Sequence, residues 1–327
     1  MRLLVITGYG KRLSVEGKVF KVEDRNKSSS KVNPADIESI VIESSGVSIT
    51  SAAIELASMA GIPIFIIRGR GSPTVISPIY SVKTAETRRK QYSATTGKSG
   101  CTLAKSLVRS KISNQAECLR NLNRYFNDED VRKEVEKLRE NSKRVQELQC
   151  SENWSSQLRQ IESSAARAYW GSLAVFLPES IGFDGRDVDS GDAFNCSLNY
   201  IYALLYSECF KKLSIAGLDP YGGIYHVDKA GRMSLVYDFS DPVKPFLDYS
   251  LTRERQLLLN IKVSDGVLDE DARKNIILLY DGARKSKVRI YDKTSVTFQE
   301  ALTSFAFNLA ESFRKSEEAR MDMSMKW

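Results

Sequence analysis

The spacing of apolar residues changes near residue 80, and this change constrains the fold more than any other feature. Before it, short β-branched runs separated by turn signals predict strands. These strands are expected at residues 3–7, 12–22 (a hairpin around Glu16-Gly17), 39–43, 62–67 and 74–76. One helix is expected among them, at residues 50–60, because its apolar spacing is helical and Gly61 follows as a C-cap residue.

After residue 80, apolar residues recur at intervals of three and four, which predicts long amphipathic helices. These helices are expected at residues 103–125, 130–149, 157–177, 194–213, 270–280 and 295–320. Residues 321–327 show neither pattern and are expected to form a loose tail. The sequence therefore predicts an α+β fold: a small N-terminal β-rich domain, residues 1–80, followed by a larger and mostly α-helical domain, residues 81–327.

Composition limits the class of protein. The chain has 327 residues, of which 42% are hydrophobic and 27% charged, values typical of globular proteins. No segment approaches the ~20 consecutive apolar residues that span a bilayer, so we expect no membrane partner. The five cysteines are scattered and include no Cys-x-x-Cys pair, namely Cys101, Cys118, Cys150, Cys196 and Cys209. We therefore expect neither a disulfide framework nor a zinc site, and a cytoplasmic location.

Positive charge is concentrated in one segment. The net charge is +7, and residues 81–120 contain nine basic residues against Glu86 and Glu117. The nine are Lys83, Arg88, Arg89, Lys90, Lys98, Lys105, Arg109, Lys111 and Arg120. A phosphate backbone is a natural partner for such a segment, because binding releases counterions. The alternative, a helix face that is simply solvated, remains open.

The only histidine, His226, ends the run Gly217 to His226, and two aspartates follow it at Asp238 and Asp241. Imidazole and carboxylate groups together suit Mn²⁺ or Mg²⁺ better than ions that prefer thiolate. This pattern indicates a divalent metal site. A hydrogen-bonded histidine with two solvated aspartates is the alternative interpretation.

Glu162 is a further candidate for the same site. It lies on a predicted helix and shares a face with Ala165, Ala166 and Tyr169. Small alanines allow another helix to approach closely, which would bury the carboxylate in part and require a cation or a donor to neutralise it. The alternative is an exposed glutamate that only contacts its own helix.

These residues together resemble a known family, the CRISPR-associated integrase that is the first of the numbered Cas proteins. Four ordered pieces carry the resemblance: the helix of Glu162, residues 195–206, residues 217–226, and residues 234–245. Upstream, residues 103–115 are similar to the family's first long helix, and residues 49–53 and 61–65 match its β half. The resemblance covers most of residues 1–255.

The resemblance implies a homodimer formed through the N-terminal domain, and a Mn²⁺ or Mg²⁺ site. By motif, the catalytic ligands fall on Glu162, His226 and Asp241, with Asp238 close by. One departure concerns Asp241, since relatives often have glutamate there and Pro242 follows it directly. Proline restricts the preceding residue, so it could displace Asp241 or make it the N-cap of a helix that begins at Pro242.

The implied function is a metal-dependent DNA endonuclease and integrase that inserts spacer DNA into a CRISPR array by attack of a 3′-hydroxyl on a phosphodiester. Double-stranded DNA is the expected substrate, and the small second numbered Cas protein the expected partner. The residues expected to hold DNA are Arg88, Arg89, Lys90, Lys105, Arg109, Lys111, Lys229, Lys244 and Arg253. Two other functions stay open: a non-catalytic nucleic-acid-binding scaffold, and a general metal-dependent nuclease.

Overall fold

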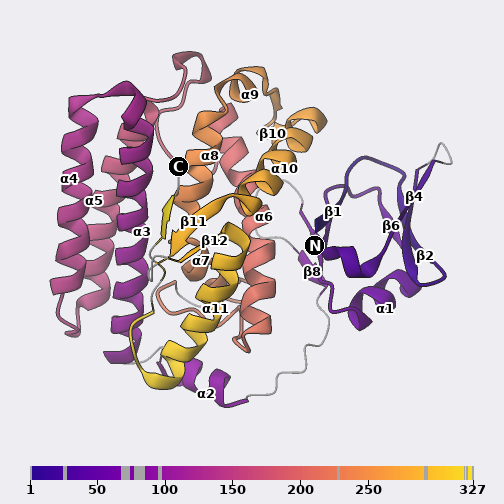
Figure 1. The fold of residues 1–327 in the computed structure, drawn as a ribbon, viewed down its shortest axis with the longest axis horizontal. Coiled ribbons are helices and arrows are strands. Elements are labelled where there is room, and N and C mark those ends of the chain that lie inside the picture. The colour runs from indigo at the N-terminus through magenta and orange to yellow at the C-terminus, as the bar shows by residue number, and fades with distance from the viewer. Residues whose placement is uncertain are drawn as a thin grey trace.

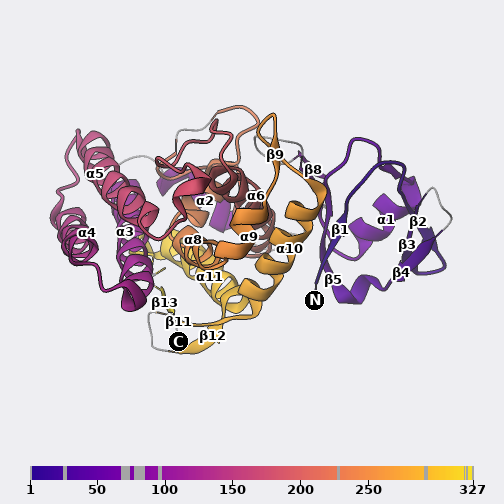
Figure 2. The same ribbon diagram turned by 90° about the horizontal axis from the view of Figure 1, so that it is seen from above.

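The computed structural model describes residues 2–24, 28–67, 74–76, 85–94, 98–226, 229–290, 294–319, 321 and 323–325. A β-rich part lies at one end of the molecule, and helices α3, α4 and α5 lie at the other, on the far side of the remaining helices (Figure 1). The view from above shows the same separation (Figure 2). This arrangement confirms the predicted α+β fold class. Within the described residues, no helix is both long and apolar enough to cross a membrane.

Two four-stranded sheets make up the β-rich part. One has the order β1-β5-β7-β8, in which β1, β5 and β7 are parallel, and the other has the order β4-β3-β2-β6. Their bounds are β1 (Arg2–Ile6), β2 (Arg12–Glu16), β3 (Val19–Glu23), β4 (Ser29–Val32), β5 (Ile37–Ile42), β6 (Ser48–Ile49), β7 (Ile64–Ile66) and β8 (Thr74–Ile76). Helix α1 (Ser51–Met59) follows β6, and a 3₁₀ turn (Pro34–Asp36) precedes β5.

Local sequence explains these elements. The predicted hairpin is confirmed as β2 and β3, and Gly17 takes the positive φ (66°) that the tight turn requires. Helix α1 begins where the side chain of Thr50 accepts a hydrogen bond from the Ala53 amide. It ends before Gly61, whose φ of 65° matches its predicted place after the C-cap.

The rest of the described chain is mostly helical. Its helices are α2 (Ala85–Ala94), α3 (Lys98–Phe126), α4 (Glu129–Glu147), α5 (Trp154–Ala174), α6 (Ala193–Ile215), α7 (Ser234–Ser240), α8 (Lys244–Arg253), α9 (Arg255–Asn260), α10 (Glu270–Lys285) and α11 (Phe298–Lys315). A 3₁₀ turn (Glu179–Ile181) precedes α6. The short strands are β9 (Val263–Ser264), β10 (Val267–Leu268), β11 (Lys287–Ile290), β12 (Ser295–Thr297) and β13 (Met323–Met325).

One disulfide corrects the expectation drawn from the cysteines. Cys101, near the start of α3, is bonded to Cys150, which follows α4, with the two Cα atoms 5.8 Å apart. Cys118, Cys196 and Cys209 are buried as thiols. The two cysteines are 49 positions apart in the sequence, so no local pattern reveals the pairing. They meet because α3 and α4 are neighbours and the chain turns back on itself. The pairing also removes the support that scattered cysteines gave to a reducing compartment.

The C-terminal residues correct a second expectation. Met321 is fully buried, and β13 pairs antiparallel with β11, so the described residues of this segment, 321 and 323–325, do not form a loose tail. The predicted helix at 295–320 begins only at Phe298, because Ser295 to Thr297 form β12 on the other edge of β11. A strand of three residues is too short for an alternating pattern of apolar residues to be detected. It forms because a partner strand offers backbone hydrogen bonds.

Charged and aromatic contacts join the β-rich part to the helices. Phe65 of β7 packs edge-to-face on Phe210 of α6, with ring centroids 5.9 Å apart. Glu38 of β5 forms ion pairs with Lys212 of α6 (2.8 Å) and with Arg284 of α10. These contacts fix the sheet against α6, the helix that also lies behind the candidate site.

Candidate metal centre

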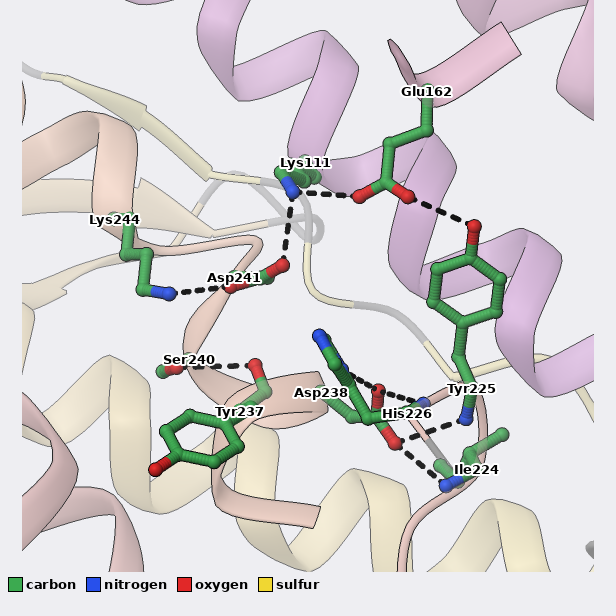
Figure 3. Close-up of polar contacts among 10 residues, drawn as sticks. All are labelled: Lys111, Glu162, Ile224, Tyr225, His226, Tyr237, Asp238, Ser240, Asp241 and Lys244. Atoms are coloured by element: carbon green, nitrogen blue, oxygen red, sulfur yellow. Dashed lines mark hydrogen bonds and ion pairs between the residues drawn. The ribbon is translucent and has the colours of Figure 1, made fainter. Parts of the chain in front are cut away.

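Asp238, on helix α7, shapes the loop that presents His226. Its carboxylate accepts hydrogen bonds from the backbone amides of Ile224 (2.6 Å), Tyr225 (3.0 Å) and His226 (3.0 Å). It also contacts His226 Nδ1 at 2.6 Å (Figure 3). The residue is only 3% exposed. Both oxygens are thus engaged within the protein, and Asp238 holds the backbone of the loop that carries His226.

His226 is oriented by this contact. A carboxylate only accepts, so Nδ1 carries the hydrogen and the Nε2 atom is left with the lone pair. Burial alone would lower the pKa of His226, but the hydrogen bond and the charge of Asp238 outweigh it and raise that pKa above its ordinary value. A histidine whose second nitrogen donates to a carboxylate is the usual arrangement for a metal ligand.

Glu162 lies on α5. Of the residues predicted to share its face, Ala165 and Tyr169 are fully buried and Ala166 is half-buried. Its side chain is 18% exposed, and Lys111 Nζ donates to its Oε1 at 2.6 Å. The hydroxyl of Tyr225 donates to Oε2 at 2.8 Å. The carboxylate is therefore partly buried and is neutralised by a cation and a donor, which is what burial requires.

Asp241 follows helix α7 directly as its C-cap, in helical geometry (φ −55°, ψ −44°), and its amide donates to the carbonyl of Tyr237. The expectation that it caps a helix beginning at Pro242 is wrong, since α8 begins at Lys244. The side chain accepts from Lys111 at 2.9 Å and from Lys244 at 2.6 Å. Burial raises its pKa, but the charges of Lys111 and Lys244 hold the pKa of Asp241 far below its usual range, so it is ionised.

The candidate residues line a shared hollow. A small cavity of about 10 Å³ is lined by Glu162, His226, Asp238 and Asp241, together with Lys111 and Tyr225. A larger pocket of about 750 Å³ shares Lys111, His226 and Asp241 with it. The larger pocket is rich in aromatic and basic side chains, namely Trp170, Tyr202, Tyr206, Tyr237, Arg186, Lys229, Arg232 and Lys244. Such a lining suits a nucleic acid strand, which offers both phosphates and bases.

The donor set fits a hard or borderline divalent cation. Glu162 and Asp241 offer carboxylate oxygens that converge on one point, and that point is held by the ammonium group of Lys111 (Figure 3). His226 Nε2 adds an imidazole nitrogen, and such O and N ligands match Mn²⁺ or Mg²⁺. Across the described residues, no three Asp, Glu, His or Cys side chains already form a closed cluster for a metal. The carboxylates are thus paired by a lysine instead of being preassembled around a metal.

Only some of the residues predicted to hold DNA lie at the candidate centre or at the larger pocket. Lys111 and Lys244 form ion pairs inside the centre, and Lys229 is exposed at the larger pocket. Lys105 donates to the carbonyls of Gln146 (3.1 Å) and Leu148. The others are Arg88, Arg89 and Lys90 on α2, Arg109, which lies 4.0 Å from Glu318, and Arg253, which stacks on Tyr249. Lys83 lies outside the described residues.

Two features of the centre could not be identified from the sequence. The first is the position of Lys111, which was predicted to contact phosphate. It lies between the carboxylates of Glu162 and Asp241, which are 51 and 130 residues away in the sequence, so no local pattern could predict these ion pairs. Beneath the pocket, Asp248 accepts hydrogen bonds from the hydroxyls of Tyr169 (2.8 Å) and Tyr202. Burial raises the pKa of Asp248 to about 6, against the lowering effect of the two tyrosines.

Comparison with known proteins identifies the family of the chain. The family model described as CRISPR associated protein Cas1 matches residues 4–282. The CRISPR-associated endonuclease Cas1 2 of Saccharolobus solfataricus is 33% identical over 322 residues, which cover 98% of this chain and 97% of that protein. A casposase bound to its integration product superposes with a TM-score of 0.83 at 21% identity, over 97% of this chain and 92% of the casposase. A Cas6-RT-Cas1–Cas2 complex gives a TM-score of 0.78 at 20% identity, over 96% of this chain and 35% of that one. The chain belongs to the Cas1 family of CRISPR-associated proteins.

Proposed function

We propose that this protein is a Mn²⁺- or Mg²⁺-dependent DNA endonuclease and integrase that inserts spacer DNA into a CRISPR array. The observation that carries the proposal is the convergence of Glu162 and Asp241 on one cation position beside His226. Support also comes from the Saccharolobus relative, which is named an endonuclease, and from the similarity in fold to a casposase solved with its integration product.

Each side chain of the centre has a distinct role in this proposal. Glu162 and Asp241 would hold the ion through oxygen and His226 through Nε2, while Asp238 fixes the orientation of His226. A divalent ion held there would polarise the scissile phosphate and stabilise the attacking oxygen, a DNA 3′-hydroxyl in integration or water in cleavage. Tyr225 orients Glu162 through its hydroxyl, and burial with the nearby Glu162 charge raises the pKa of Tyr225, which keeps that hydroxyl protonated.

The larger pocket would bind the DNA strand next to the ion. Arg186, Lys229, Arg232 and Lys244 bring positive charge to its wall, and Trp170 is among its aromatic residues. Contacts of this kind address the backbone and the faces of bases, so they do not select a sequence. A protein that accepts many different spacers needs this tolerance.

Double-stranded DNA, a second copy of the chain and the small second Cas protein are the proposed partners, and the cytoplasm is the proposed location. A solved complex similar in fold contains both Cas1 and Cas2, and a further one contains a Cas1 protein with DNA. In this proposal the second copy pairs through the N-terminal β-rich part. The two other functions, a binding scaffold without catalysis and a general nuclease, make different predictions for the products.

A strand-transfer assay tests the proposal. Short duplex DNA with 3′-hydroxyl ends is mixed with supercoiled plasmid, with Mn²⁺ or with EDTA, for wild type and His226→Ala, in the presence and absence of the second Cas protein. We expect joined product that requires the metal and is lost in His226→Ala. Cutting without joining when the partner is present would indicate a general nuclease. DNA that is bound but left intact under all conditions would instead favour the scaffold.

A further inference from the structure

The position proposed for the metal is held by a side chain of the protein itself. Lys111 of α3 reaches between helices α5 and α7, and its Nζ lies 2.6 Å from Glu162 Oε1 and 2.9 Å from Asp241 Oδ2 (Figure 3). We propose that Lys111 is an internal cation that keeps this position in the metal-free protein, and that a divalent ion binds by displacing its ammonium group towards the larger pocket. This inference rests on the proposed metal-dependent function.

The two cations cannot share the position. A divalent ion bound by carboxylates lies roughly 2.0–2.2 Å from their oxygens, so it would occupy the space that the ammonium hydrogens fill. The side chains of Lys111, Glu162 and Asp241 are 19%, 18% and 16% exposed. Little water would therefore screen the repulsion between the Lys111 ammonium group and a divalent ion bound beside it. Entry of the ion therefore requires that the ammonium group leave both carboxylates.

The structure offers the displaced ammonium group a second location. Lys111 lines the larger pocket as well as the small cavity, and lysine carries its charge on a flexible four-carbon stem. Asp241 is also paired with Lys244 at 2.6 Å through its other oxygen, so only one of its two cations has to move. In the larger pocket, the displaced ammonium group would face the DNA phosphate. Without metal, the charge of Lys111 would thus offset the two carboxylates. With metal bound, it would offset the negative charge of the DNA.

Calorimetric titration of the full-length protein with Mn²⁺ alone tests the exchange. Wild type is compared with Lys111→Met and with Lys143→Met, which removes the same charge from an exposed lysine of α4 that lines neither the larger pocket nor the small cavity. We expect Lys111→Met to bind Mn²⁺ more tightly by roughly tenfold or more, a change typical for groups around a metal site. Lys143→Met should bind as wild type does. Equal or weaker binding by Lys111→Met would overturn the inference, since the lysine would then prearrange the carboxylates for the ion.

A second measurement uses wild type alone and does not depend on the folding of a variant. Brief acylation with an amine-reactive reagent, followed by peptide mass spectrometry, should label Lys111 more in Mn²⁺ than in EDTA, with Lys229 unchanged. Mn²⁺ binding in the calorimeter with no change at Lys111 would refute the exchange but leave the proposed function standing. A wild type that binds no Mn²⁺ at all would refute both.

Discussion

Two clusters of buried charge differ in how far their side chains are exposed to solvent. The open cluster is Lys111, Glu162, Asp241 and Lys244, whose side chains are 16–19% exposed and line two cavities. The closed cluster is Glu38, Glu208, Lys212 and Arg284, where exposure is 9% for Lys212, 5% for Glu38 and 1% for Glu208 and Arg284. Both are chains of ion pairs. The proposed exchange of a cation requires solvent access, which the open cluster has. The closed cluster lacks this access and holds the β-rich part against the helices.

The closed cluster joins elements that are distant in the sequence. Glu38 of β5 accepts from Lys212 of α6 (2.8 Å), from Arg284 of α10, and from Gln299 of α11 (2.5 Å). Arg284 Nε lies 2.9 Å from Glu208, which also accepts from the Tyr280 hydroxyl. Three helices, α6, α10 and α11, therefore bind to one carboxylate of the β-rich part. A buried pair of this kind contributes little net energy when intact, but it is costly to break.

The largest effect is expected from breaking the closed cluster. Glu38→Ala should lower the free energy of unfolding by about 3–5 kcal/mol, because it leaves Lys212 and Arg284 buried without their partner. Urea unfolding followed by circular dichroism measures this loss. Strand transfer per folded molecule should remain, since Glu38 lies outside the centre.

The control for Glu38→Ala is an exposed ion pair. Glu136 pairs with Arg139 on the surface of α4, with side chains 63% and 49% exposed. Glu136→Ala should cost less than about 1 kcal/mol, as exposed pairs do. If Glu38→Ala cost no more than this control, the closed cluster would have to be hydrated in solution, and the contrast between the two clusters would disappear.

The next effect concerns the loop beside the open cluster. Asp238→Asn should weaken Mn²⁺ binding by roughly 10- to 100-fold, the usual range for a residue that orients a metal ligand. An amide has one accepting oxygen, so it cannot serve three backbone amides and His226 Nδ1 as the carboxylate does. Calorimetric titration with Mn²⁺ gives the change in affinity.

Asp219→Asn is the matched control for Asp238→Asn. Asp219 lies in the same loop and accepts from the Tyr221 amide at 2.9 Å and from the Tyr92 hydroxyl, on the side that faces α2. We expect its substitution to leave Mn²⁺ affinity near that of wild type. Equal losses in both variants would mean that loop order in general, and not the orientation of His226, sets the affinity.

The sequence predicted the parts of this molecule that depend on local pattern. The long helices follow from their apolar period, and Glu162, His226 and the two aspartates from motifs on neighbouring elements. The choice between Asp238 and Asp241 could not be made, because it depends on how α7 ends. Asp238 still lies within the helix and faces the loop amides, whereas Asp241 is the capping residue and faces Lys111.

The features that were missed all depend on contacts between distant segments. Lys111 pairs with residues on two other elements, Cys101 meets Cys150 only because α3 and α4 are neighbours, and β13 exists because β11 is there to pair with it. The closed cluster is of the same kind, since Glu38 and Arg284 are 246 residues apart. Helical or strand periods carry no information on such pairs.

The last effect concerns Glu43, a carboxyl that is shielded from solvent and has no hydrogen-bond partner among the described residues. Glu43 follows β5, the strand of Glu38, and its side chain is 2% exposed, with Arg273 Nε at 3.4 Å. Neither of its oxygens has a hydrogen-bond partner among the described residues. Burial raises the pKa of Glu43 to about 7, although the charge of Arg273 acts against it. Glu38, by contrast, is buried with partners and stays ionised, because its cations hold its pKa below the usual value despite burial.

Glu43→Gln tests this difference through the dependence of stability on pH. The folded pKa lies above the unfolded value of about 4.3, so the folded state binds more protons between these limits, and wild-type stability falls as pH rises from about 4 to about 7. The variant should lack this fall and exceed wild type at pH 8 by up to about 3 kcal/mol, since each unit of the shift corresponds to about 1.4 kcal/mol. The exposed Glu55→Gln is the control and should leave the curve unchanged. If urea unfolding gave parallel curves for Glu43→Gln and wild type, Glu43 would have to be ionised at pH 5, and Arg273 alone would suffice to keep a buried carboxylate charged.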